Sequence, residues 1–147
     1  MKTIKFVMRL KGKEIRSIAP DTSVFDVLKI MAEKDIGALP VMDGKKLVGI
    51  FSERDYARKV ILKGKSSKNM LVSEIMSTNL VMITPDQTTE QGMALMTAKH
   101  VRHLPVMDKE KLVGFISIGD LVKSIISEQN QIIDKMGRDI GEKTGWY

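Results

Sequence analysis

The stretch Leu39-Pro40-Val41-Met42-Asp43 occurs a second time, unchanged, at residues 104–108. A shift of the chain by 65 residues superposes the two copies, and it also superposes residues 46–49, Lys-Leu-Val-Gly, on residues 111–114. With this shift, 15 of the 37 positions in residues 20–56 are identical without a gap. Chance would give roughly two or three identities at average residue usage. The chain therefore contains two copies of one structural unit.

Each copy is predicted to form a strand, a helix, two strands joined by a tight turn, and a closing helix. The first helix is indicated by Val24, Val27, Leu28 and Met31, which share one helical face. In the second copy, Gly92 weakens the matching stripe. The predicted strands span residues 15–18, 39–42 and 46–51 in the first copy and residues 80–83, 104–107 and 111–116 in the second. The closing helices are predicted at about residues 52–62 and 117–127.

The length and the repeat together define the expected domains. A chain of 147 residues and 16.5 kDa holds one domain or two very small ones. We expect an α/β (α+β) fold in which two tandem repeats, residues 12–68 and 74–130, pack with pseudo-two-fold symmetry. A unit of about 55 residues is near the lower limit for folding alone, so the two copies are expected to share a core. Residues 63–69 form the expected joint.

Residues 131–147 lie outside the repeat and are predicted to form a helical tail. Ile132, Ile133, Met136 and Ile140 fall on one helical face. We expect this face to dock on a dimer partner or across the pair, and the alternative is a frayed terminus. Trp146 would then be a usable fluorescence probe.

Composition excludes several functional classes. The chain has no cysteine, which excludes disulfides, a thiolate zinc site and a cysteine nucleophile. No apolar run approaches the roughly 18 residues of a membrane span. The N-terminal residues lack the apolar core of a secretory signal. We therefore expect a mature cytoplasmic protein that does not contact membranes.

The net charge of +6 raises the alternative of a nucleic-acid-binding protein. The Lys and Arg residues are scattered singly, however, and only four Phe, two Tyr and one Trp are available for stacking on bases. This pattern favours a solvated surface that attracts small anionic ligands, and nucleic acid remains the alternative partner.

The motif Gly-apolar-apolar-Ser-x-x-Asp closes each pair of strands. It spans residues 49–55, with Ser52 and Asp55, and residues 114–120, with Ser117 and Asp120. One interpretation is a capping box, in which the serine and the acid satisfy the first turn of the next helix. The other is a ligand site, because free amides at such a turn suit an anion and a carboxylate can hold ribose hydroxyls. Both roles can hold together.

The repeat, both Leu-Pro-Val-Met-Asp stretches and both Gly-x-x-Ser-x-x-Asp turns resemble the paired cystathionine-beta-synthase-type (CBS) domains, from about residue 11 to residue 128. The resemblance implies a regulatory, energy- or redox-sensing module without catalysis. It implies adenosine nucleotides as ligands in the clefts between the units: AMP first, with ADP, ATP, NAD(H) or S-adenosylmethionine as alternatives. It also implies a homodimer that acts on a partner protein the sequence does not name.

The resemblance assigns roles by position. Asp55 and Asp120 are expected to hold ribose, and Ser52 and Ser117 ribose or phosphate. The remaining expected contacts are Arg54, Arg102 and His103 for phosphate and Ile18, Ala19, Gly37, Ala38, Ile83 and Thr84 for the base. Arg54 has Gly119 as its counterpart in the second copy, so unequal occupancy of the two clefts is expected.

Other residue patterns support neither a metal site nor an enzyme. His100 and His103 are three apart, but a helix is expected to end between them and no third ligand is near, so contact with phosphate or solvent is favoured over metal. Met31, Met96, Met42 and Met107 occupy matched positions, which indicates core packing. No phosphate-loop, dinucleotide or nucleophile-elbow sequence occurs. We therefore expect neither catalysis nor a required cofactor.

Overall fold

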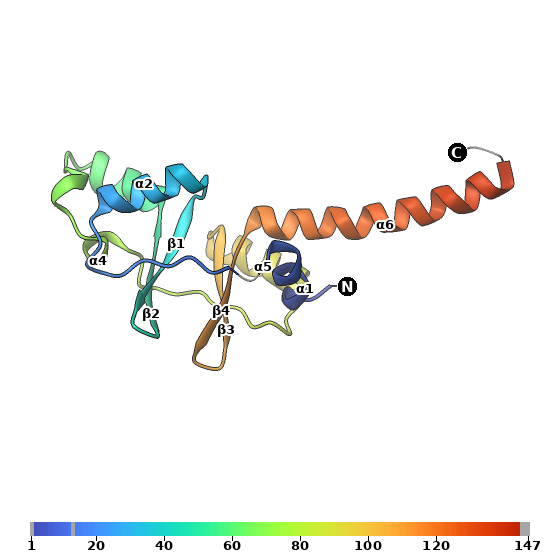
Figure 1. Cartoon of the computed structure of the whole chain (residues 1–147), viewed down its shortest axis with the longest axis horizontal. Coiled ribbons are helices and arrows are strands. Elements are labelled where there is room, and N and C mark those ends of the chain that lie inside the picture. The colour runs from blue at the N-terminus through green and yellow to red at the C-terminus, as the bar shows by residue number, and fades with distance from the viewer. Residues whose placement is uncertain (1, 13, 145–147) are drawn as a thin grey trace.

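The computed structural model describes residues 2–12 and 14–144 and shows two like units side by side (Figure 1). The first unit contains the hairpin of β1 (Ala38–Asp43) and β2 (Lys46–Ser52), and the second the hairpin of β3 (His103–Asp108) and β4 (Lys111–Ser117). The two hairpins have the same register: Ala38 pairs with Ser52, and His103 pairs with Ser117. Both registers shift at the same place in the repeat. The predicted tandem architecture is confirmed.

The helix of each unit precedes its hairpin and has matching ends. Helix α2 (Val24–Lys34) is capped by the Ser23 side chain, and α5 (Thr89–Lys99) by that of Thr88. Each helix ends at a residue with positive φ, Asp35 in the first unit and His100 in the second. The predicted end of the second helix between the two histidines is confirmed.

The strands predicted at residues 15–18 and 80–83 are wrong. Each segment makes only an isolated parallel bridge, from Ile18 to Val41 and from Ile83 to Val106. A proline follows two residues later in both copies and limits further pairing. Ile18 and Ile83 are nevertheless buried, so these segments pack against the hairpins without forming strands.

The closing helices differ between the units. In the first, α3 (Glu53–Tyr56) continues into a π-helical turn, Ala57–Ile61. In the second, α6 (Ile118–Thr144) continues well past residue 127, where the sequence predicted an end. The predicted tail is thus the second half of this helix, which points away from both units (Figure 1). The side chains of Ile132, Ile133 and Ile140, and Trp146, lie outside the described residues, while Met136 is exposed.

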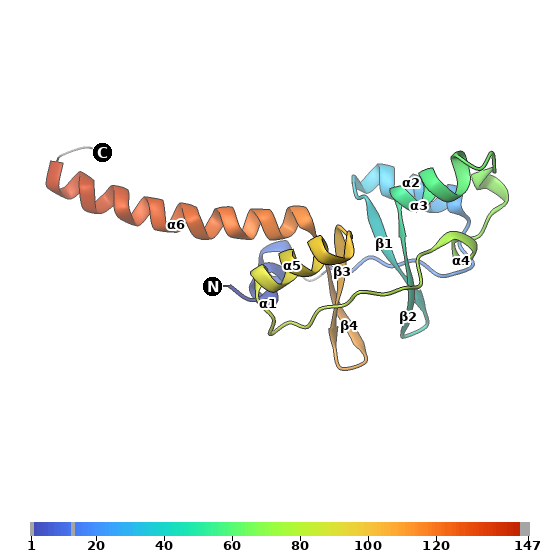
Figure 2. The same cartoon turned by 180° about the vertical axis from the view of Figure 1, so that it is seen from behind.

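Two further helices are exchanged between the repeats. Helix α1 (Ile4–Lys11) packs against α5 and α6 in the second unit, whereas α4 (Val72–Ile75) packs against β2 in the first. The chain therefore crosses between the units twice: residues 14–22 pass over the hairpins in Figure 1, and residues 77–87 pass over them in Figure 2.

Matching backbone bonds hold the exchanged helices. The amide of Ile4 donates to the carbonyl of Gln87 at 2.8 Å, and that of Val72 donates to the carbonyl of Thr22 at 2.9 Å. Gln87 follows Thr22 by 65 residues, but Val72 follows Ile4 by 68. Because α1 is bonded to the second repeat in this way, the second unit includes α1. This helix lies before residue 12, where the sequence predicted that the first domain begins.

Each unit has its own hydrophobic cluster. Phe51 and Val60 are fully buried in the first, and Ile4 and Leu121 in the second. A Cβ on Gly92 would lie 3.2 Å from Leu121 and 3.4 Å from Ile4. The glycine that weakens the predicted apolar stripe thus gives α1 room to dock. Within the described residues, no helix is both long enough and apolar enough to cross a membrane.

Candidate functional site

A cavity of about 1010 Å³ lies between the two units. Its walls come from three parts of the chain. They are the Gly-x-x-Ser-x-x-Asp turn of the first repeat, the crossing segment that follows α4, and the end of α5 with the start of β3. We call residues 49–55 and 114–120 the two signature turns. The residues that line it are Gly37, Ile50, Ser52, Glu53, Arg54, Asp55, Arg58, Lys59, Ser77, Asn79, Leu80, Val81, Lys99, His100, Val101, Arg102 and His103. The sequence placed six of these residues in a site: Ser52, Arg54, Asp55, Gly37, Arg102 and His103.

Both signature turns form capping boxes, as one of the two interpretations predicted. In the first, the Asp55 amide donates to Ser52 Oγ at 3.2 Å and the Ser52 amide donates to Asp55 Oδ2 at 3.1 Å. In the second, the Asp120 amide donates to Ser117 Oγ at 3.1 Å and the Ser117 amide to Asp120 Oδ2 at 2.8 Å. These bonds fix each carboxylate at the start of a helix and leave its second oxygen for other partners.

The second oxygen of Asp55 faces the cavity wall. Ser77 Oγ donates to Asp55 Oδ1 at 2.9 Å, and Lys59 Nζ lies 3.3 Å from the same oxygen. Lys59 also donates to the carbonyl of Ile75 at 2.9 Å, so its ammonium is shared. Asp55 is 8% exposed, while the Lys59 side chain is 40% exposed. The contact with Lys59 is therefore the longest and the most accessible of those that the carboxylate makes.

Asp120 has a different partner. Lys11 Nζ, at the end of α1, lies 2.8 Å from Asp120 Oδ2 and also donates to the carbonyl of Phe115. Burial raises the pKa of Asp120, but the hydrogen bonds from Lys11 and from Ser117 outweigh it, and the pKa lies below its usual value of 3.8. Asp120 and Ser117 do not line the cavity of Asp55.

The cavity at Asp55 is basic. Arg54, Arg58, Lys59, Lys99 and Arg102 line it, against two acids, Glu53 and Asp55. Cations this close together attract anions, and arginine forks suit phosphate oxygens in particular. The guanidinium of Arg54 donates to the carbonyl of His100 at 3.2 Å and so spans the two units across the cleft.

His103 joins this cavity to the second signature turn. Its ring stacks on Phe115, with centroids 5.6 Å apart and planes 11° from parallel. Burial, and then the charge of Lys11, lower the pKa of His103 below 6.5, with Asp120 acting in the opposite direction and Arg102 in the same one. His103 is therefore neutral at pH 7 and can accept a proton when an anion approaches.

Besides the pair at Asp120, four of the expected site residues (Ala19, Ala38, Ile83 and Thr84) line neither the cavity at Asp55 nor a second, smaller cavity. Ala38 is buried in β1 and Thr84 lies in an exposed turn, where its hydroxyl bonds Asp86. Ile18 lines a separate cavity of about 430 Å³. Ala19 and Ile83 line neither cavity.

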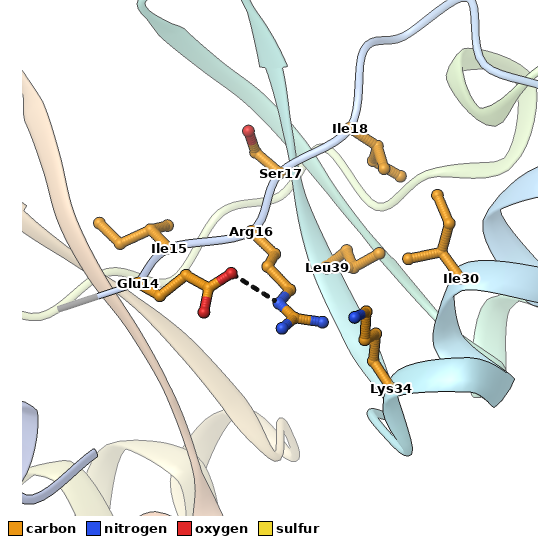
Figure 3. A pocket seen from close by; sticks show the side chains of 8 residues that line it. All are labelled: Glu14, Ile15, Arg16, Ser17, Ile18, Ile30, Lys34 and Leu39. Carbon is orange, nitrogen blue, oxygen red and sulfur yellow. Dashed lines mark ion pairs between the residues drawn. The ribbon is translucent and has the colours of Figure 1, made fainter. Parts of the chain in front are cut away.

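Figure 3 shows this smaller cavity, which lies beside α2. Arg16 and Glu14 form an ion pair at 3.3 Å at its edge, and Lys34 reaches in from the end of α2. The repeat relates Glu14 and Lys34 to Asn79 and Lys99, which line the larger cavity. The smaller cavity is therefore part of the second cleft.

The sequence missed several lining residues. Arg58 and Lys59 lie one turn beyond the motif, and Ser77 and Asn79 lie on the exchanged segment. The helical spacing of four residues between Asp55 and Lys59 was a usable signal, because such residues share a face. Nothing local in the sequence pointed to Ser77, which lies 22 residues from Asp55.

Comparison with known proteins agrees with this architecture. The family model described as CBS domain matches residues 7–62 and again residues 72–127. The chain belongs to the CBS-domain family. The CBS-domain protein CBSX3 of Arabidopsis thaliana, a mitochondrial protein, is 36% identical over 143 residues, which cover 91% of this chain and 69% of CBSX3.

Solved CBS structures match over most of the chain. The crystal structure of the CBS domain protein NE2398 is 48% identical, with a TM-score of 0.82, and the match covers 86% of this chain and 99% of that one. The structure of CBSX2, determined in complex with AMP, is 27% identical, with a TM-score of 0.71, over 88% of this chain and 99% of that one. The resemblance stated from the sequence is confirmed.

Proposed function

We propose that this CBS pair is a regulatory module that binds an adenosine nucleotide in the cleft at Asp55. The observation that carries the proposal is the cavity itself, which places one buried carboxylate among five cationic side chains. A carboxylate suits the adjacent hydroxyls of a ribose, and the cations suit phosphate. The complex of the related CBSX2 with AMP supports the same class of ligand.

Binding would exchange partners on the carboxylate. The four contacts on Asp55 come from the Ser52 amide, the Ser52 hydroxyl, Ser77 and Lys59. A ribose hydroxyl would replace Lys59, because that contact is the longest and the most exposed. The released ammonium would then be free to bind phosphate together with Arg54 and Arg102, so one exchange would serve both parts of the ligand.

The proposed role is sensing rather than turnover. The described residues contain no group of three histidine, cysteine or acidic side chains that could hold a metal. The charged groups of the cavity bind and orient an anion, and none of them is placed as an activated nucleophile beside a base. A ligand that bridges Arg54 and Arg102 would stiffen the joint between the units, and a partner protein would read that change.

Calorimetric titration with AMP and with adenosine tests the assignment. Asp55→Asn should weaken both ligands by about 1.5–3 kcal/mol, the usual contribution of charge-assisted hydrogen bonds. Arg102→Gln should weaken AMP and leave adenosine unchanged, because it is assigned to phosphate. Asp43→Asn, at the exposed end of β1, is the matched control.

The capping role gives a different pattern. If Asp55→Asn lowers the melting temperature but binds both ligands like the parent protein, the carboxylate is only a helix cap and the nucleotide assignment fails. A steep loss of affinity for oligonucleotides with salt, together with no response to AMP, would favour the nucleic-acid alternative.

We also propose that the module is a homodimer. Ile61 is 54% exposed and its repeat equivalent Ile126 is 49% exposed, and Leu62 and Val122 extend the two patches. Two equivalent apolar patches can pair with a second copy about a two-fold axis. Val60 and Leu121, from the same two closing helices, are instead buried in their own units. Light scattering should give twice 16.5 kDa for the parent and the monomer mass for Ile126→Lys.

A further inference from the structure

The two signature turns meet different groups across their clefts. In the first repeat Ser77 provides two contacts: its amide donates to the carbonyl of Ile50 at 2.8 Å, and its hydroxyl donates to Asp55 Oδ1 at 2.9 Å. The donor to the Ile50 carbonyl is therefore a backbone amide and not a charged side chain, because Ile50 and Ser77 form a backbone bridge. From across the cleft, the first carboxylate is thus held by one neutral donor, the Ser77 hydroxyl.

In the second repeat one ammonium contacts both counterparts, and it meets Asp120 on Oδ2, the oxygen that also accepts from the Ser117 amide. Lys11 Nζ donates to the carbonyl of Phe115, the counterpart of Ile50, and to Asp120 Oδ2, the counterpart of Asp55. The Lys11–Asp120 distance is 2.8 Å. A side chain has therefore replaced a backbone bridge, and a charged donor has replaced a hydroxyl.

Lys11 can reach Asp120 because the segment that begins in α1 is longer than the matching segment that follows α4. Ten positions separate Met8 of α1 from Ile18, but only seven separate their counterparts Met76 and Ile83. The three extra residues extend α1 to Lys11, and Gly12 then turns the chain with a φ of 99°. The lysine is thereby carried to the mouth of the second signature turn.

The wall of the second cleft also differs in charge. Gly119 and Ser124 take the repeat positions of Arg54 and Lys59. These neutral replacements remove two of the five cations that line the cavity at Asp55, whereas Arg16 of the smaller cavity, the counterpart of Val81, adds one. Asp120 lines neither of the two cavities described above.

We propose that Lys11 occupies the ribose position of the second repeat, so that each chain takes up one nucleotide, in the cleft at Asp55. The second cleft is a latent site for uncharged adenosine, and it opens when the Lys11 ammonium leaves Asp120. This inference rests on the proposed function, because it assumes that a signature carboxylate holds ribose.

The exchange is unfavourable but reversible. Neutral hydroxyls would replace an ammonium, so the hydrogen bonds to the carboxylate stay charge-assisted but the attraction between opposite charges is lost. The Lys11 side chain is 37% exposed, however, so water can solvate the ammonium once it is released. Lys59 presents less of an obstacle in the first cleft, since it lies 3.3 Å from Asp55 and shares its protons with Ile75.

Adenosine is the appropriate probe, because it carries the ribose hydroxyls without a phosphate. Equilibrium dialysis of the full chain gives the stoichiometry, and backbone amide spectra of the turns at Ser52 and Ser117 show which cleft responds. The parent protein should bind one adenosine per chain and shift only the first turn. Lys11→Met should bind two and shift both turns. Lys5→Met, an exposed lysine of the same helix, is the matched control and should bind one.

The outcomes separate the inference from the proposed function. Two adenosines on the parent chain, or one on Lys11→Met with a response of the first turn alone, would overturn the inference and leave the first cleft assigned. A response of the second turn alone in Lys11→Met would support the blocking role of Lys11 and reject the cleft at Asp55. Failure of both proteins to bind would reject both proposals. Adding Asp120→Ala to Lys11→Met should return the stoichiometry to one.

Discussion

Met76 lies directly over Gly49, so closely that a Cβ on the glycine would stand 2.5 Å from the sulfur. Met8 lies over Gly114 in the same way, with 2.8 Å between the sulfur and the added Cβ. Met76 directly follows α4 and Met8 lies in α1, and each glycine belongs to the last strand before a signature turn. The repeated glycine therefore gives the exchanged segment its place against the sheet, next to the site.

Gly49→Ala should destabilise the protein by about 1–3 kcal/mol, the usual cost of overpacking a tight contact. The carbonyl of Ser77 would lie only 3.1 Å from the new Cβ, so the backbone of the crossing segment must also move. Urea denaturation measures the loss. Gly119→Ala is the control, because its Cβ would meet only Ser117 Oγ at 3.5 Å and a helical alanine is favoured by up to about 1 kcal/mol.

Ile4→Ala should destabilise the protein by about 2–5 kcal/mol, because Ile4 is fully buried in the second unit. Leu10→Ala, on the same helix, should change stability by less than about 0.5 kcal/mol, since Leu10 is 55% exposed. Thermal unfolding compares the two variants. Equal small effects would mean that α1 is not part of the second core in solution.

The ion pair of Lys11 with Asp120 should make stability depend on pH in the acid range. The pKa of Asp120 is lowered in the folded state, so the pair contributes stability above the usual carboxyl value of 3.8 and loses it as the pH falls through the lower, folded value. Lys11→Met should cost up to about 1 kcal/mol at neutral pH, because the pair is partly exposed. The difference from the parent should vanish at pH values below the folded pKa, where both states are protonated. Urea titrations across this range check it.

His103 should couple nucleotide binding to proton uptake. Its pKa is lowered in the free protein, first by burial and then by Lys11 and Arg102. A phosphate beside the ring would raise that pKa, so affinity for AMP should improve as the pH falls below about 7, by less than tenfold per pH unit for one proton. Calorimetry in buffers of different ionisation enthalpy counts the protons. His103→Gln should remove the His103 contribution and leave that of the AMP phosphate itself.

The register and caps of both repeats could be predicted because they depend on neighbours in the chain. The Leu-Pro-Val-Met-Asp stretch, the hairpin turn and the returning strand specify a hairpin through local pairing. Ser52 and Asp55 lie three residues apart, and this spacing alone permits the capping box that the structure shows. Arg102 and Gly37 reached the cavity as expected, because the repeat relates their positions.

The sequence by itself determined the repeat, the two hairpins, the signature turns and the family. Only the tertiary structure decided that α1 completes the second unit, that Ser77 faces Asp55, and that Lys11 binds Asp120 across 109 residues. The physical reason is that the apolar face of a short helix specifies burial but not which surface buries it. A shift of 65 residues aligns the repeats, whereas the exchanged helices follow a shift of 68 that becomes visible only when both are packed.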